Sequence, residues 1–562
     1  MSITESHVRG ATDLSLIEST IGAFFDQTTD RLAQLDALVV RHQQIRWSFA
    51  ELRRRVDGLA AGFLALGLRP GDRLGIWSPN NAEWVLTQFA TAKAGLILVN
   101  INPAYRLNEL EYALNKVGCV ALITAASFKT SNYVEMLTTL APEIASAAPG
   151  RLKSVKLPSL KVLICIGESA QGFIRFDEVP QLATEDHHRE LVQISAKISN
   201  TDAVNIQFTS GTTGSPKGAT LSHRNILNNA FFVGRGIGLK QSDRFCIQTP
   251  LYHCGGMVVG TLMCLSHGVT MVFPSEWFDP LRSIEAVQAE RCTGIGGVPT
   301  MFLGMLNHPE FSLFDLSSLR VGWVGGAPCP IEMMKRCRSD MQLKDLTILF
   351  GMTETSPVCL QTALDDPIER KVSSVGRVHP HLEVKVIDME GRTVPVGTPG
   401  EFCTRGYSVM LGYWGDPGRT SEAIDADGWM HTGDLGTIDP EGYGNVVGRS
   451  KDMVIRGGEN IYPVEIENVL YEHPSVMDVQ VFGVPDERFG EELCAWIRLK
   501  QGEAMTDLDV RHFCKDRIAH FKVPRHIRFV DEFPATVTGK IQKFVMRQRM
   551  IEELQLTVQK TA

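Results

Sequence analysis

Residues 209–218 read Thr209-Ser-Gly-Thr-Thr-Gly-Ser-Pro-Lys-Gly218, a segment that combines glycines, hydroxyl side chains and one lysine. Residues 202–208 precede it and are predicted to form a strand, with Val204, Ile206 and Phe208 alternating along one face. A strand that ends in a Gly/Ser/Thr loop presents free backbone N–H groups, short hydroxyl donors and a cation, which is what a phosphate chain requires. Taken alone, the segment also fits a flexible surface loop.

The loop differs from the Walker A pattern, Gly-x-x-x-x-Gly-Lys-Ser/Thr. Here Lys217 follows a proline and precedes Gly218 and Ala219. The difference argues against a P-loop NTPase, and any nucleotide is expected to be bound by another fold.

Composition limits the class of protein. The chain has 562 residues and a net charge of −8, without a long block of one charge, which argues against nucleic acid as a main partner. Its 12 cysteines form no CxxC pair and no Cys/His cluster at zinc spacing, so they are expected to be reduced and mostly buried. The N-terminus resembles neither a signal peptide nor a transit peptide, and no apolar run reaches the roughly 18–20 residues that span a bilayer. We expect a soluble, cytoplasmic protein.

Short apolar runs alternate with helix-like segments over most of the chain. Residues 73–77 and 162–166 are predicted to be buried strands, whereas 82–94 and 107–117 have the apolar spacing of helices. This alternation favours a layered α/β core with parallel strands. Antiparallel strands with polar turns are predicted between about 375 and 450, and the last hundred residues are predicted to form a small separate α+β unit.

Two further segments carry acids in contexts that suit ligand binding. Phe350-Gly-Met-Thr-Glu-Thr-Ser-Pro357 places Glu354 between two threonines after an apolar run, and a carboxylate beside hydroxyls can hold Mg²⁺. The alternative is a helix N-cap with an acidic first turn. Residues 428–436 contain Asp434 in a glycine-bounded turn, where it can accept hydrogen bonds from a ribose diol or serve turn geometry alone.

Two more segments lie towards the C-terminus. Residues 448–463 contain the adjacent glycines 457 and 458, which allow a close backbone approach to a ligand or simply form a linker. Residues 534–543 present Lys540 directly after a glycine. A single loop lysine of this kind is normally exposed to solvent and without function.

Together and in this order, the five segments resemble the signature motifs of the adenylate-forming superfamily of acyl-CoA synthetases, luciferases and peptide-synthetase adenylation domains. The resemblance runs from about Ile45 to about Arg549. It is strongest to the medium-chain fatty acyl-CoA synthetases, through residues 252–256, 405–414 and 448–463.

The resemblance implies an α/β fold with two domains. Residues 1–450 would form the N-terminal adenylate-forming domain, made of layered α/β subdomains and a small β-barrel-like subdomain. Residues 451–562 would form a small, mobile α+β domain that carries the catalytic lysine. The activity implied is an ATP-dependent acyl-CoA synthetase that makes acyl-AMP with release of pyrophosphate and then transfers the acyl group to CoA.

The resemblance also assigns residues to the nucleotide. Glu354 would hold Mg²⁺, Thr353 would contact the α-phosphate, and Lys540 would reach the attacking carboxylate. Asp434 would bind the ribose with support from Arg449. The β- and γ-phosphates would be wrapped by Thr209, Ser210, Gly211, Thr212, Thr213, Gly214, Ser215, Pro216 and Lys217. The adenine would be flanked by Gly326, Ala327, Pro328, Phe350, Gly351 and Met352.

The remaining assignments concern the acyl group and the second half-reaction. The resemblance points to His253, Val298 and Trp323 at the acyl pocket, although a structural histidine and a core tryptophan are equally good interpretations. Lys451 would be the hinge, and Gly457 and Gly458 would lie beside the pantetheine tunnel. The expected partners are a carboxylic acid, ATP and CoA, in a monomer or homodimer. Transfer to a carrier protein and a non-catalytic nucleotide-binding homologue are the alternatives.

Overall fold

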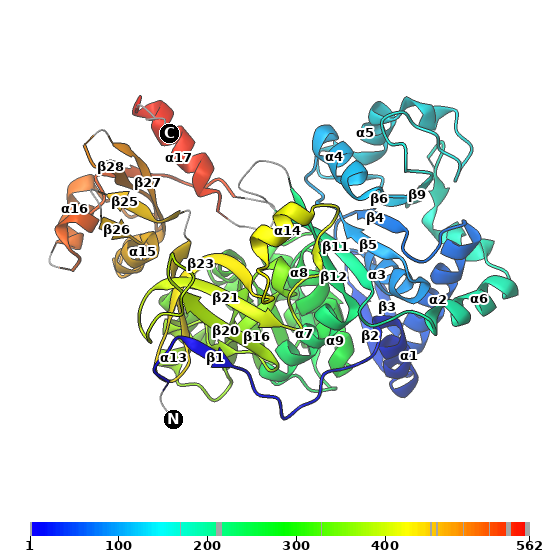
Figure 1. Ribbon diagram of the computed structural model, residues 1–562, viewed down its shortest axis with the longest axis horizontal. Coiled ribbons are helices and arrows are strands. Elements are labelled where there is room, and N and C mark those ends of the chain that lie inside the picture. Colours follow the sequence, from blue (N-terminus) through cyan, green and yellow to red (C-terminus); the bar gives the residue numbers. More distant parts are fainter. Residues whose placement is uncertain are drawn as a thin grey trace.

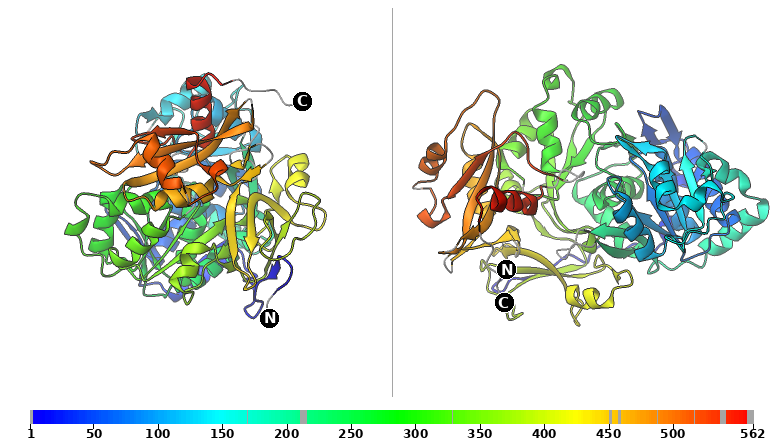
Figure 2. Two further views of the ribbon diagram at one scale, coloured as in Figure 1. Left: turned by 90° about the vertical axis from the view of Figure 1, so that its left-hand side faces the viewer. Right: turned by 90° about the horizontal axis from the view of Figure 1, so that it is seen from above.

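The computed structural model consists of a large N-terminal body and a smaller C-terminal lobe at one end (Figure 1). Seen from above, the lobe and the blue and cyan part of the body, which contains β4 (Arg73–Trp77), β5 (Ile97–Asn100) and β6 (Ala121–Ala125), again lie at opposite ends of the molecule (Figure 2). None of the helices in the described part of the chain is long and apolar enough to cross a membrane. The structure describes residues 3–168, 170–209, 216–327, 329–449, 452–456, 459–486, 488–515, 517–535 and 541–556.

The first sheet of the body has eight strands, and its central strands are parallel. Apolar side chains alternate between its two faces, so that Leu74 and Ile76 face one helix layer and Trp77 the other. Coverage of both faces explains why these strands are near-continuous apolar runs. In spatial order the strands are β10 (Ile174–Arg175), β9 (Val162–Ile166), β6 (Ala121–Ala125), β4 (Arg73–Trp77), β5 (Ile97–Asn100), β11 (Ala203–Thr209), β12 (Lys217–Ser222) and β22 (Gly412–Tyr413).

The second sheet has nine strands with a parallel centre. One face shares a buried helix layer with the first sheet, and the other packs on a separate apolar cluster. In spatial order the strands are β19 (Arg377–Val378), β18 (Val358–Gln361), β17 (Asp345–Gly351), β16 (Val321–Gly325), β15 (Gly294–Gly297), β13 (Arg244–Ile247), β14 (Thr270–Phe273), β2 (Asp36–Val40) and β3 (Ile45–Ser48).

Several helices of the body begin or end at capping residues. In α3 (Ala82–Ala94), Asn81 accepts from the Trp84 N–H at 2.8 Å, and Gly95 ends the helix at φ +70°. The others are α1 (Ile21–Arg31), α2 (Phe49–Ala65), α4 (Leu107–Val117), α5 (Tyr133–Leu140), α6 (Glu185–Ser195), α7 (His223–Gly236), α8 (Cys254–Gly256), the π-helical η3 (Met257–Leu262), α9 (Met263–His267), α10 (Pro280–Glu290), α11 (Pro299–Leu306), α12 (Ile331–Ser339), α13 (Ile368–Ser373) and α14 (Pro417–Ala423).

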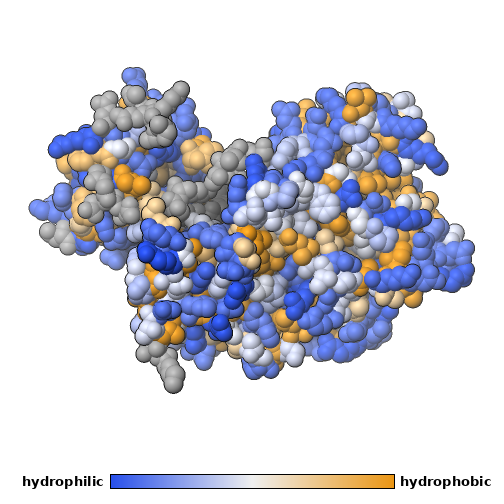
Figure 3. Space-filling model, in the orientation of Figure 1, coloured by the Kyte–Doolittle hydropathy of each residue, from blue (hydrophilic) through white to orange (hydrophobic). Residues whose placement is uncertain are grey.

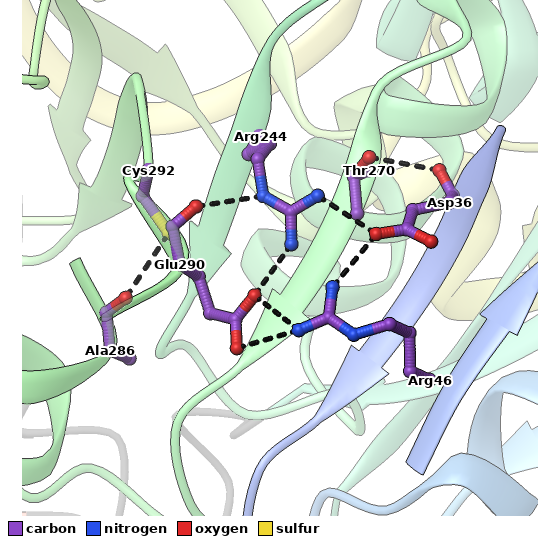
Figure 4. Close-up of polar contacts among 7 residues, drawn as sticks. All are labelled: Asp36, Arg46, Arg244, Thr270, Ala286, Glu290 and Cys292. Atoms are coloured by element: carbon purple, nitrogen blue, oxygen red, sulfur yellow. Dashed lines mark hydrogen bonds and ion pairs between the residues drawn. The ribbon is translucent and has the colours of Figure 1, made fainter. Parts of the chain in front are cut away.

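An ion-pair network closes the amino ends of the second sheet (Figure 4). Arg244, at the start of β13, bonds Asp36 at 3.1 Å and Glu290 at 2.6 Å, and Arg46 bonds the same two carboxylates at 2.7 Å each. The network ties the β2–β3 hairpin to α10. Because it lies at the amino ends of the strands, it leaves their carboxyl ends free for other groups.

The antiparallel strands predicted between about residues 375 and 450 form a five-stranded sheet, which β1 (His7–Arg9) from the N-terminal segment completes at one edge. Its inner face buries Val384, Val386 and Phe402. In spatial order the strands are β1 (His7–Arg9), β20 (Leu382–Ile387), β21 (Gly400–Gly406), β23 (Met430–Ile438) and β24 (Gly444–Arg449).

The C-terminal lobe is an α+β unit with its own core, as predicted from the sequence. Val479, Val481 and Ala495 pack with Ile466 and Val510 at its centre. The elements are β25 (Val454–Arg456), β26 (Glu459–Ile461), α15 (Pro463–Tyr471), β27 (Val476–Asp486), β28 (Gly490–Leu499), α16 (Asp507–Cys514), β29 (His526–Phe529) and α17 (Lys543–Glu553).

Candidate active site

The strands on either side of the Gly/Ser/Thr loop form an antiparallel pair. Thr209 ends β11 directly opposite Lys217, the first residue of β12. The Tyr112 hydroxyl donates to the Pro216 carbonyl at 3.1 Å, and the Trp414 N–H donates to the Gly218 carbonyl at 2.8 Å. The loop is thus anchored at its second end by contacts from two other elements. Its residues Ser210, Gly211, Thr212, Thr213, Gly214 and Ser215 lie outside the described residues.

Glu354 is the centre of a buried polar cluster. It lies in a single 3₁₀ turn, Thr353–Thr355, that follows β17, and it is 4% exposed. Its Oε1 accepts hydrogen bonds from the Thr209 hydroxyl at 3.0 Å and from the Tyr413 hydroxyl at 2.9 Å. Three elements far apart in the sequence therefore meet at one carboxylate.

Tyr413 was not predicted as a site residue. It lies on the two-residue strand β22, beside Ala219 of β12, and its ring centroid is 4.8 Å from Lys217 Nζ. Burial raises the pKa of Tyr413, and the charge of Glu354 raises it further, so the phenol stays protonated and donates its hydrogen bond to the carboxylate. The only sequence signal was its place in the segment 405–414, which resembles the family.

The donor set around Glu354 suits Mg²⁺. Among the described residues the carboxylate has hydroxyl partners and forms no ion pair, although it is buried. A buried carboxylate normally requires a charged partner. Oxygen ligands from a carboxylate and neighbouring hydroxyls are those that Mg²⁺ prefers, so the residues present fit the ion.

The candidates for adenine and ribose lie on strands of two different sheets, β17 of the nine-stranded sheet and β23 of the five-stranded sheet. Phe350 is the penultimate residue of β17, its ring centroid lies 5.6 Å from that of Phe402, and its carbonyl lies 3.5 Å from Cys359 Sγ. Burial raises the pKa of Cys359 to about 12, and the charge of Asp434 contributes to the rise. Asp434 is 6% exposed on β23, opposite Arg449 in the backbone register.

Gly326 and Ala327 follow β16, in line with the end of β17. Gly326 adopts φ +80°, a conformation that favours glycine, and a Cβ at this position would lie 3.5 Å from Val298 Cγ1. Val298 is the residue before α11. The adenine candidate Gly326 and the acyl candidate Val298 are therefore neighbours.

Cys254 links the acyl candidate His253 to the catalytic candidate Thr353. His253 Nδ1 accepts from the Gly255 N–H at 3.2 Å and lies 3.5 Å from Cys254 Sγ, and that sulfur lies 3.9 Å from the Thr353 hydroxyl. Burial raises the pKa of Cys254 to about 12, so the group remains a thiol. Cys254 is therefore a packing residue beside Thr353 and no nucleophile.

Trp323 fills the space between β15 and α8. A Cβ at Gly296 would lie 2.2 Å from the indole Nε1, and a Cβ at Gly255 would lie 3.6 Å from the far edge of the same ring. The indole is buried, and its N–H has no acceptor among the described residues. The Trp323 ring thus lies between Gly296 and Gly255, with one edge near each glycine, and close to the segment that contains His253.

A buried chain of amides joins the nucleotide strand to the acyl candidates, and the sequence did not reveal it. Gln207, two residues before Thr209, donates to Asn205 Oδ1, and Asn205 donates to Asn100 Oδ1, both at 2.9 Å. Asn100 Nδ2 in turn donates to the Tyr252 carbonyl at 3.1 Å. Polar residues within a strand are usually predicted to face solvent, so the sequence did not indicate that these three amides form a buried chain.

The same chain ends on the π-helical segment η3. Asn100 and Gln207 both approach the Met257 sulfur, at 3.5 and 3.7 Å, and Met257 begins η3. π-Helical turns are rare and occur frequently at functional sites.

The face shown in Figure 3 is hollowed between the C-terminal lobe and the body. Pro328, Lys451, Gly457, Gly458 and Lys540 lie outside the described residues, as does the side chain of Arg449.

Comparison with known proteins gives the same picture over the whole chain. The family model described as AMP-binding enzyme matches residues 25–414, and the model described as AMP-binding enzyme C-terminal domain matches residues 465–540. The medium-chain acyl-CoA ligase ACSF2, mitochondrial, of Bos taurus is 48% identical over 557 residues, covering 98% of this chain and 91% of that protein. The putative acyl-CoA synthetase YngI of Bacillus subtilis is 44% identical, covering 96% of this chain and 99% of that protein.

Solved structures with the same fold include two ligases. The anthranilate CoA ligase AuaEII in complex with anthranoyl-AMP superposes with a TM-score of 0.86 at 26% identity, over 97% of this chain and 99% of that one. The Mycobacterium tuberculosis fatty acyl CoA synthetase superposes with a TM-score of 0.71 at 28% identity, over 95% and 99% of the two chains.

Proposed function

The chain belongs to the AMP-binding enzyme family, and we propose that it is an AMP-forming acyl-CoA ligase for a medium-chain or similar aliphatic carboxylic acid. The observation that carries the proposal is the meeting of Thr209, Glu354 and Tyr413 beside Lys217. At this point the end of strand β11, the buried carboxylate of Glu354 and the cation of Lys217 lie together. The acyl candidates contact the same point through Cys254 and Thr353.

In the first half-reaction a carboxylate attacks the α-phosphorus of ATP and pyrophosphate leaves. Catalysis of phosphoryl and nucleotidyl transfer rests on positioning and on stabilising charge that develops on oxygen. Thr209 and Lys217, with the loop between them, would hold the departing pyrophosphate, and Thr353 would donate to the α-phosphate. Mg²⁺, when bound at Glu354, would offset the negative charge of the phosphates.

The nucleoside would be held by the strand ends beside this cluster. The ring of Phe350 with Gly351 and Met352 would cover one side of the adenine, and residues 326–328 the other. Asp434 would accept hydrogen bonds from the ribose hydroxyls, with support from Arg449. This arrangement agrees with the burial of Asp434, since a carboxylate that binds a diol is most effective where water is excluded.

The second half-reaction would use the C-terminal domain, which we place at residues 451–562 after an N-terminal domain of 1–450. Lys540 would stabilise charge on the attacking carboxylate and the α-phosphate in the first step. Rotation about Lys451 would then withdraw it and bring Gly457 and Gly458 to the pantetheine arm of CoA. Domain rotations of this kind commonly control turnover.

Two other acceptors or roles remain as alternatives to be tested. A carrier protein presents the same phosphopantetheine arm as CoA, so the glycines alone do not distinguish the two. A nucleotide sensor needs no Lys540, which favours an enzyme. For the compartment we propose the cytoplasm, on the observation that all twelve cysteines are free thiols.

The proposal is tested by measuring pyrophosphate release over straight-chain acids from acetate to palmitate, with and without CoA. We expect a maximum at medium chain length, AMP release that requires CoA, and loss of both when Mg²⁺ is chelated. Turnover that is confined to acetate or to aryl acids would overturn the substrate assignment. Acyl-AMP that accumulates unchanged in the presence of CoA would instead favour the carrier-protein alternative.

A further inference from the structure

Three metal-ligating side chains converge on the antiparallel sheet, away from the cluster around Glu354. Glu401 and Cys403 lie on β21, two residues apart and therefore on the same face. His431 lies on the adjacent strand β23, directly opposite Cys403 in the register. A cross-strand pair and its neighbour two residues along form a compact triangle, and the three ligand atoms lie within 4.8 Å of one another.

The two distances from the imidazole nitrogen are close to the edges of a tetrahedral metal site. His431 Nδ1 lies 3.0 Å from Glu401 Oε2 and 3.6 Å from Cys403 Sγ. With metal bonds of about 2.1 Å to nitrogen and oxygen and about 2.3 Å to sulfur, a tetrahedron has N–O and N–S edges of about 3.4 and 3.6 Å. The spacing of the His431 nitrogen from the thiol is therefore that of a metal site, and its spacing from the carboxylate differs from that of a metal site by a few tenths of an ångström.

The surrounding contacts also resemble those of a metal site. Ligating histidines usually direct their other ring nitrogen at a carboxylate, and here His431 Nε2 lies 3.8 Å from Asp425 Oδ2. Ligating carboxylates are themselves usually hydrogen-bonded, and Glu401 Oε1 accepts from the Gly433 N–H at 2.9 Å. Asp425 lies outside the triangle and forms a second, independent feature that points to an ion.

Access and proton balance are compatible with binding. The side chains of Glu401 and His431 are 27% and 31% exposed, whereas Cys403 is buried behind them. Burial raises the pKa of the Cys403 thiol to about 12, so an ion would have to displace its proton. The proton that His431 Nδ1 shares with Glu401 would move to Nε2, which faces Asp425.

We propose that Glu401, Cys403 and His431 bind a divalent transition ion of the Zn²⁺ type, with water in the fourth position. One thiol proton is released for each ion bound, and the imidazole stays neutral. Mg²⁺ does not compete, because it takes oxygen ligands and rejects thiolate. The ion would join β21 to β23 three residues before Asp434 on β23, so its binding is expected to affect the position of this ribose candidate.

The test is a titration of the full-length, metal-stripped protein with Co²⁺ in the presence of excess Mg²⁺, followed by absorbance. We expect one Co²⁺ per chain, with a thiolate-to-cobalt charge-transfer band in the near ultraviolet, and displacement of Co²⁺ by Zn²⁺. The band should disappear in Cys403→Ala and in His431→Gln. It should remain in Cys165→Ala, a matched control that alters a buried strand cysteine in the first sheet.

Asp425→Asn provides the sharper measurement, because it leaves all three ligands in place. Loss of a partner that orients a ligand typically costs about 10- to 100-fold in metal affinity, and we expect that loss here. Binding that persists in both Cys403→Ala and His431→Gln, or cobalt binding without a charge-transfer band in the unmodified protein, would overturn the proposal. Either single variant suffices if the other fails to fold.

Discussion

Replacing Tyr413 with phenylalanine removes one hydroxyl group from the cluster around Glu354 and little else. The ring that lies 4.8 Å from Lys217 Nζ is retained, so the cation–π contact and the packing are preserved. The hydrogen bond of 2.9 Å to Glu354 is lost, and one buried carboxylate oxygen then keeps only its bond from Thr209. The variant therefore tests how much the orientation of the Glu354 carboxylate contributes to activity.

The size of the effect follows from the kind of bond. A hydrogen bond to a charged group contributes about 1.5–3 kcal/mol. At about 1.4 kcal/mol for each factor of ten, this corresponds to a loss of roughly 10- to 150-fold in kcat/KM for MgATP. The assay is initial-rate pyrophosphate release against MgATP concentration at saturating acid and CoA.

Tyr443→Phe is the matched control. Tyr443 also donates its hydroxyl to a buried carboxylate, that of Asp366, and its ring also lies 4.8 Å from a cation, that of Arg370. It lies in the turn between β23 and β24 and belongs to no predicted binding group. We expect a lower melting temperature for both variants and a loss of kcat/KM only for Tyr413→Phe. Equal kinetic losses in the two, or a change of less than twofold in Tyr413→Phe, would refute the reasoning.

Three further predictions follow from other parts of the molecule. Lys540→Ala is expected to slow acyl-AMP formation by orders of magnitude while thioester formation from supplied acyl-AMP and CoA continues, and equal loss of both steps would contradict its assigned role. Gly296→Ala places a Cβ 2.2 Å from the Trp323 indole, so the indole must move. We expect the variant to lose about 1–3 kcal/mol of stability and to use a narrower range of acids. Gly304→Ala is the control, because its Cβ would meet Phe278 at an ordinary 3.5 Å. Burial raises the pKa of Asp36, but hydrogen bonds from Arg244 and Arg46 lower it more, to below its ordinary value of 3.8. Its carboxylate therefore stabilises the fold above that pH and loses the effect as pH falls through the lowered pKa, so urea midpoints of Asp36→Asn should fall less between pH 5 and pH 2 than those of the unmodified chain.

Local patterns predicted the elements of the body closely. The helices α3 and α4 have the predicted bounds, since apolar spacing and the closing glycines 95 and 118 specify them within the chain. The strand before the phosphate loop also formed as predicted, and the cysteines are buried apart from Cys329, which is partly exposed. These features depend on residues that are neighbours in the sequence.

Features that depend on register between distant strands were missed. Tyr413 contacts Glu354 only because β22 pairs with β12, and a two-residue strand has no pattern of its own. Cys403 and His431 lie 28 residues apart and meet through the pairing of β21 with β23, so their spacing resembles no metal motif. The π-helical turn at Met257 was likewise invisible, because its apolar composition also fits an ordinary helix.

The amide chain from Gln207 to Tyr252 has a consequence for how such an enzyme acquires new substrates. Because the strand that presents the nucleotide loop and the backbone beside the acyl candidates share hydrogen bonds, ATP and acid are expected to bind with a coupling free energy, and such coupling is reciprocal. A substitution that reshapes the acid pocket would then alter ATP affinity as well. Selection for a different acid would act on both ligands at once, and second substitutions that restore ATP binding should be found along this chain.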